Sequence, residues 1–137
     1  MSESRLTDAG RRTAVEMFGD DGVAILEANA ARWSRRVDEN WSELITGFVV
    51  NGMYSRDVLP TSTRELCAVA ALTVLGRTEE LDTHLRVALH TNPVEQVREV
   101  VLQMAVYGGF PVALSGMRML EAILAEPPTG SEPSASR

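Results

Sequence analysis

One histidine stands where a helix would bring it beside a carboxylate. His84 follows Glu80 by four residues, and residues four apart lie on the same side of an α-helix. Imidazole exchanges protons near neutral pH, and a neighbouring carboxylate can fix its tautomer and raise its basicity. The spacing therefore predicts a proton-transfer site with His84 and Glu80 as catalytic residues. A hydrogen-bonded histidine inside a helical core is the alternative interpretation.

Four further residues are candidates for binding a substrate. Arg77 precedes the helix of His84, and its guanidinium group could hold a carboxylate through two parallel hydrogen bonds, although an ordinary surface arginine is the more common case. Tyr54 and Arg56 lie in a polar segment, 53–60, that is either a surface connection or the rim of a pocket. Tyr107 adjoins two glycines, where it would line a cavity or pack in the core.

Glu65 has two possible roles. The segment Ser62–Glu65 fits the capping box, in which a glutamate at the third helical position reaches back to the cap residue. With Thr61 or Ser62 as the cap, Glu65 would be a structural residue at the start of a helix. A place in the substrate pocket is the second possibility, and the sequence alone does not decide between them.

The single cysteine and the net charge exclude several classes of protein. One cysteine, Cys67, cannot form an internal disulfide, and on an alanine-rich helix it is expected to be a small buried residue. The net charge of −6 opposes binding to nucleic acid or to an anionic membrane. There is no apolar run of about 20 residues and no signal-peptide pattern. We expect a cytoplasmic protein.

The spacing of apolar residues predicts an all-α protein with one domain, a bundle of six to seven helices. Aromatic residues make up only 5% of the chain, and the apolar content is carried by residues that suit closely packed helices. Asn51 and Gly52 are expected to end the third helix, and Gly76 the fourth. The domain is expected to cover 1–126 and a disordered tail 127–137. The expected helices cover 5–18, 23–36, 38–50, 62–75, 78–91, 93–108 and 110–124.

The central part of the chain resembles a known family. The segments ALTVLGRTEELDTHLRVAL and EQVREVVLQMAVYGGFPVAL, within 64–111, are similar to the carboxymuconolactone decarboxylase family of the alkylhydroperoxidase-like superfamily. The similarity extends more weakly to 10–21 and 52–59. Redox members of the superfamily carry a Cys-x-x-Cys pair at the positions of Arg77 and Glu80. Dithiol peroxidase chemistry is therefore excluded for this chain.

The resemblance implies an all-helical, alkylhydroperoxidase-like fold and a homo-oligomer, a trimer or a hexamer, with sites near subunit contacts. It also implies an enzyme without cofactor or metal that removes CO2 from a lactone acid in aromatic degradation. In that hypothesis His84 donates the proton, Glu80 orients it, and Arg77 contacts a carboxylate or a developing oxyanion. The partner would be a small carboxylate or lactone, with no nucleic acid or membrane involved.

Two departures from the family leave other functions open. Position 65 is commonly a small polar residue in the decarboxylases, and 90–93 replace the usual Asn-Asn-Gly turn. A lyase, cyclase or isomerase of a biosynthetic pathway would use the same histidine without releasing CO2. A non-catalytic binding or assembly protein is the third possibility. It would use Glu80 and His84 in structural hydrogen bonds and have no cavity beside them.

Overall fold

A computed structural model describes residues 5–128 of the chain. This part contains helices and their connections but no strand, which confirms the predicted fold class. The helices are α1 (Asp8–Phe18), α2 (Gly22–Arg36), α3 (Trp41–Glu43), η1 (Leu44–Tyr54), α4 (Thr61–Leu75), α5 (Thr78–Thr91), α6 (Val94–Gly108) and α7 (Phe110–Leu124).

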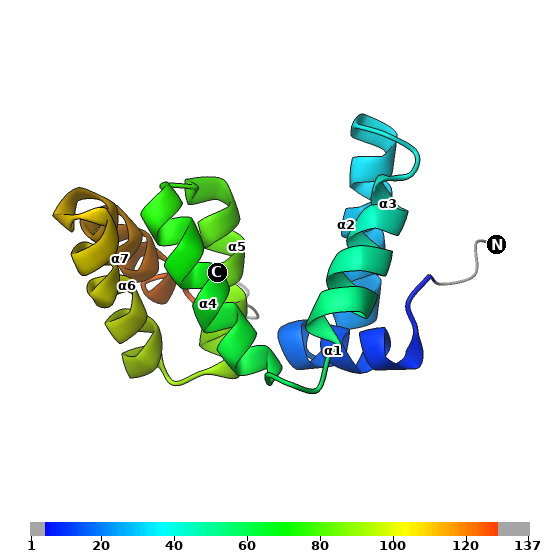
Figure 1. Cartoon of the computed structure of the whole chain (residues 1–137), viewed down its shortest axis with the longest axis horizontal. Helices are drawn as coiled ribbons and strands as arrows, with labels where there is room; N and C mark the ends of the chain where they lie inside the picture. Colours follow the sequence, from blue (N-terminus) through cyan, green and yellow to red (C-terminus); the bar gives the residue numbers. More distant parts are fainter. Residues whose placement is uncertain (1–4, 129–137) are drawn as a thin grey trace, which may run out of the picture.

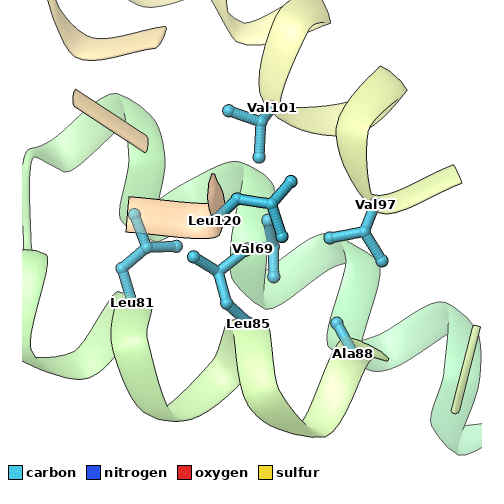
Figure 2. Packing of buried hydrophobic residues seen from close by; sticks show 7 residues of the cluster. All are labelled: Val69, Leu81, Leu85, Ala88, Val97, Val101 and Leu120. Carbon is cyan, nitrogen blue, oxygen red and sulfur yellow. The ribbon is translucent and has the colours of Figure 1, made fainter. Parts of the chain in front are cut away.

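The helices α4 to α7 enclose the apolar core. Figure 2 shows side chains from all four of these helices pointing toward one another. This core cluster is almost completely buried, and its spacing on each helix matches the predicted apolar stripes. Its members are Val69, Leu81, Leu85, Ala88, Val97, Val101 and Leu120. Three short connections, 76–77, 92–93 and 109, place successive helices next to each other.

The N-terminal helices form a second group beside this core. In Figure 1, α2 and α3 lie apart from α4 to α7, and 55–60 connect the two groups. Helix α1 packs against α2 and η1 and also contacts α4 and α5. Gly22 allows the close packing of α1 and α2, because a Cβ atom there would collide with a backbone oxygen of Ala14. The site described below lies where α1 and the end of η1 meet α4 and α5.

The third helix differs from the prediction in type and in length. It was expected to be an α-helix that ends at Asn51 and Gly52, but a π-helix continues through both residues to Tyr54. Gly52 does not adopt a positive φ, and the Asn51 side chain bonds elsewhere. Its Oδ1 accepts hydrogen bonds from the backbone N–H and the hydroxyl of Thr7, and its Nδ2 donates to the Arg5 carbonyl. Asn51 therefore fastens the N-terminal segment rather than ending a helix.

The predicted cap of α4 is also wrong. Pro60, not Thr61 or Ser62, precedes α4, and no side chain caps the helix. Glu65 cannot complete a capping box, because its carboxylate faces α5 instead of its own helix start. By contrast, Gly76 ends α4 in the left-handed conformation, as expected, with φ 66° and ψ 29°.

Two predictions concern the ends and the surroundings of the bundle. The expected tail covers 127–137, and most of it, 129–137, lies outside the described residues. Within 5–128, none of the helices combines the length and the apolar character that crossing a lipid bilayer requires. The proposed domain boundary at residue 126 stays a prediction.

Candidate active site

A buried carboxylate meets the histidine between α4 and α5. Glu65 Oε2 lies 2.8 Å from His84 Nδ1. The Glu65 side chain is completely buried, whereas the His84 side chain keeps 28% of its surface exposed. Two antiparallel helices position the pair, since Glu65 lies in the second turn of α4 and His84 in the middle of α5. The sequence indicated the histidine, but it did not show that its partner lies 19 residues earlier.

Glu80 and Arg77 are not joined to this pair. Both side chains are exposed, and within 5–128 neither forms a hydrogen bond or ion pair. Arg77 immediately precedes α5, which places it about 10 Å from His84 along the helix axis at a rise of 1.5 Å per residue. Glu65 therefore occupies the place beside the imidazole that the sequence hypothesis gave to Glu80. The catalytic role of Glu80 and the binding role of Arg77 stay predictions.

A cleft of about 540 Å³ opens at the other end of α5. Helix α1, the segment 54–60, the first turn of α4 and the last turn of α5 line it. Tyr54 and Arg56, which we considered as residues of a pocket rim, both border this cleft, and so do Arg12 and His90. The segment is therefore the wall of a cleft rather than only a surface connection.

Tyr54 connects the cleft to the buried pair. It is the last residue of η1, borders the cleft and lies beside the Glu65 carboxylate. Burial, together with the charge and the hydrogen bonding of Glu65, raises the pKa of Tyr54 far above its usual value of 10. A phenol is protonated at neutral pH even at its usual pKa, and the shift strengthens this state, so the hydroxyl is available as a hydrogen-bond donor.

The side chains of Ser55 and Arg64 hold this wall in place. The Ser55 hydroxyl donates to the Val50 carbonyl at 2.7 Å, which secures the end of the π-helix. Arg64 Nη2 donates to the Arg56 carbonyl at 3.1 Å. Thus the residues that precede α4 are fixed by hydrogen bonds to both of the helices that they connect.

Three residues show where sequence patterns did not find the site. Arg12 was not among the predicted residues, because nothing in the spacing of α1 indicates that this arginine meets a segment 44 residues further on. Tyr107 is 70% exposed on α6, and it borders neither this cleft nor a second one, which lies between α2 and the segments 5–6 and 39–46. Cys67 was expected to be buried but is exposed, since it lies on the opposite side of α4 from Glu65.

The arrangement is suited to moving a proton. An ionised Glu65 accepts from Nδ1–H, which leaves Nε2 as the ring nitrogen that can exchange a proton with a ligand. The partial exposure of His84 gives a ligand access to the ring, while the cleft is lined by the last turn of α5 and not by His84 itself. Within 5–128, no group of three or more His, Cys, Asp or Glu side chains is arranged to hold a metal ion.

Comparisons with known proteins agree with the resemblance seen in the sequence. The sequence model of the carboxymuconolactone decarboxylase family matches residues 39–122, which include Tyr54, Glu65 and His84. The 4-carboxymuconolactone decarboxylase of Acinetobacter baylyi is 31% identical over 87 residues, 63% of this chain. That similarity spans 65% of the relative, slightly less than two thirds of its length.

Proposed function

Because this chain belongs to the carboxymuconolactone decarboxylase family, we propose that it is a carbon–carbon lyase that releases CO2 from a lactone or keto acid. The observation that carries the proposal is the hydrogen bond of 2.8 Å between the buried Glu65 carboxylate and the partly exposed His84 ring. This pair provides an acid/base group whose orientation is fixed on one side and whose other nitrogen is free. The name of the relative from Acinetobacter baylyi supports the same class of reaction.

The proposed reaction needs one proton donor. Cleavage of the bond between the carboxylate and its α-carbon releases CO2 and leaves an electron pair, which an adjacent carbonyl or conjugated lactone absorbs. His84 Nε2–H then delivers a proton to carbon, and the Glu65 carboxylate stabilises the imidazolium form before that transfer. The partly exposed ring then takes up a proton from bulk solvent, so that one proton is consumed for each CO2 released.

The cleft is the proposed place for the polar groups of the substrate. Arg12 and Arg56 line it, and neither guanidinium group has a partner within 5–128. The acidic side chains in the same cleft are Glu16 and Asp57, and Glu16 already accepts a hydrogen bond of 2.6 Å from Thr61. We therefore assign binding of the substrate carboxylate to the arginines of the cleft in preference to Arg77.

A second candidate is an isomerase or cyclase that moves a proton without loss of CO2. The observation in its favour is Glu65 itself, since a buried carboxylate bonded to the imidazole makes His84 a base as well as an acid. In this alternative Nε2 removes a proton from one carbon and returns it to another. The substrate would again be a lactone or keto acid with acidic C–H bonds.

We also propose that the protein assembles with copies of itself, as a trimer or a hexamer. Large apolar side chains on α6 and α7 are at least half exposed, and isolated proteins rarely expose such groups together. They are Leu102, Val106, Tyr107, Phe110 and Leu114. Light scattering coupled to gel filtration should give a multiple of the 14.9 kDa chain mass, and Val106→Asp should lower that multiple. A wild-type protein that elutes as a monomer at all concentrations would contradict the assembly.

The enzymatic proposal is tested with purified protein and carboxymuconolactone. Substrate loss and CO2 release are followed together, because the decarboxylase must produce one CO2 for each molecule consumed. Loss of substrate without CO2 would replace the decarboxylase by the isomerase or cyclase. If neither this lactone nor related keto acids are consumed, the enzymatic proposal is wrong.

A further inference from the structure

A second cavity lies on the N-terminal side of the molecule, away from the Glu65–His84 pair. Its volume is about 530 Å³, and it lies between α2 and the segments 5–6 and 39–46. This size is within the range of roughly 300–1,000 Å³ that is usual for small-molecule sites. Within 5–128 it shares no lining residue with the cleft beside α5, and α2 and α3 lie apart from α4 to α7 in Figure 1. The N-terminal groove, as we call this cavity, is therefore separate from the proposed active site.

One face of α2 forms the long wall of the N-terminal groove. The side chains that line the groove recur every four residues along α2, so they lie on one side of the helix. At a rise of 1.5 Å per residue this wall is about 14 Å long. Its first part is apolar apart from the exposed Glu27, and its last part is polar. The residues of the wall are Leu26, Glu27, Ala30, Ala31, Ser34 and Arg35.

The floor of the groove is buried and carries a hydroxyl group without a partner. Ala30 and Thr46 border the groove although they are only 6% and 8% exposed, and within 5–128 the Thr46 hydroxyl forms no hydrogen bond. Ser34 Oγ accepts a bond of 3.0 Å from the Ser42 backbone N–H, and Ser42 Oγ accepts one of 3.0 Å from Arg5 Nη1. Neither serine hydroxyl donates to a residue of 5–128. The three groove hydroxyls, those of Ser34, Ser42 and Thr46, can therefore all donate to a ligand.

The polar end of the groove also holds a free cation. Arg35 forms no hydrogen bond or ion pair within 5–128, whereas Arg5 Nη1 lies 3.7 Å from Glu43 Oε2. The acidic side chains that line the groove, Glu27 and Glu39, are exposed, and within 5–128 neither pairs with an arginine. Glu27 lies at the opposite, apolar end, about 12 Å from Arg35 along the helix axis. A planar guanidinium group matches a carboxylate, which can accept two parallel hydrogen bonds from it.

We propose that the N-terminal groove binds a small carboxylic acid with an unbranched apolar chain. The ligand carboxylate accepts hydrogen bonds from the Arg35 guanidinium group and from the groove hydroxyls, so that the unused donors at the polar end find acceptors. The chain lies along α2 over Leu26, Ala30 and Ala31, where the two alanines leave space for it. An extended chain fits because the wall is long and its middle is lined by alanines. Binding needs no reaction at His84, and so this site goes beyond the proposed function.

The test titrates octanoate, below the concentration at which it forms micelles, into the full-length protein labelled with nitrogen-15. The backbone amide signals of Ala31, Ser34 and Thr46 should shift until the site is saturated, whereas those of Tyr54 and His90 in the cleft should not move. Octanol has the same chain without the carboxylate, and it should bind at least about tenfold more weakly because the charge-assisted hydrogen bonds are lost. Octylamine should also bind more weakly than octanoate, because its ammonium group would meet the free guanidinium group.

Variants of the groove locate the carboxylate. Arg35→Gln should raise the Kd of octanoate about tenfold or more, since the charged donor is lost. The matched control is Arg36→Gln, which removes the next charge along α2 outside the groove and should leave the Kd unchanged. Thr46→Val removes the buried hydroxyl with little change in shape, and it should raise the Kd about fivefold. If Thr46→Val fails to fold, Ala31→Leu fills the apolar part from its exposed side and should abolish binding.

Four results would overturn the inference. The first is the absence of any saturable shift with octanoate. The second is an affinity that falls in Arg12→Gln but not in Arg35→Gln, which would place the carboxylate in the cleft. Tighter binding of octylamine than of octanoate would show that Glu27 and Glu39 select a cation instead. Groove signals that change with protein concentration and not with octanoate would show that a second copy of the chain covers the groove. None of these results depends on turnover, so the proposed lyase activity is tested separately.

Discussion

Replacement of Glu65 by leucine separates a functional carboxylate from a structural one. The change removes the charge-assisted hydrogen bond to His84, which is worth about 1.5–3 kcal/mol. It also removes the buried Oε1 without a partner, which costs about 1–3 kcal/mol while it is present. The two effects nearly cancel. His84 is not left as an isolated buried group, because its side chain is 28% exposed.

We therefore expect Glu65→Leu to change the free energy of unfolding by no more than about 1 kcal/mol, or about 3 °C in melting temperature. Activity should fall about 100-fold or more, because the imidazole loses the group that orients it. The measurements are thermal unfolding and steady-state turnover, with Glu65→Gln as the isosteric control. A loss of about 3–5 kcal/mol, typical of a broken structural ion pair, with turnover retained would refute the reasoning.

Three further predictions concern stability. Arg86→Ala should lower the melting temperature near neutral pH, because Arg86 bonds to Asp82 and Glu126 and lowers the pKa of Glu126. A lowered carboxyl pKa stabilises the folded protein above the usual value of 4.5. The difference in melting temperature between variant and wild type should therefore vanish as the pH falls below that value. Gly22→Ala should destabilise the protein by about 1–3 kcal/mol in urea unfolding, since a Cβ atom would force α1 and α2 apart. An unchanged urea midpoint would show that the contact between α1 and α2 accommodates a methyl group. Leu85→Ala should cost about 2–5 kcal/mol, because Leu85 is completely buried in the core, and a loss below 1 kcal/mol would contradict the described packing.

Periodic patterns were sufficient for most of the fold. The apolar spacing placed α4, α5, α6 and α7 within about one residue of their observed bounds, because each of them buries one continuous stripe. Gly76 ended its helix as predicted, since a positive φ favours glycine locally. These features depend on neighbours in the sequence, which is why the sequence alone could predict them.

The site depends on contacts between segments that are distant in the sequence. Glu80 was the predicted partner of His84 because helical spacing relates residues four apart, whereas Glu65 reaches the ring from another helix. Asn51 was expected to end a helix, but its side chain has partners 44 and 46 residues away that helical spacing cannot show. The same limit explains why Arg12 was missed in the cleft.

The most direct test of the account is the rate of CO2 release by His84→Asn. Asparagine cannot donate a proton to carbon near neutral pH, yet it can keep a hydrogen bond to Glu65 and so preserve the fold. With a lactone acid that the wild type decarboxylates, we predict a kcat about 10²–10⁴ times lower and an unchanged circular dichroism spectrum. Full CO2 release by folded His84→Asn would contradict the assignment of His84 as the proton donor.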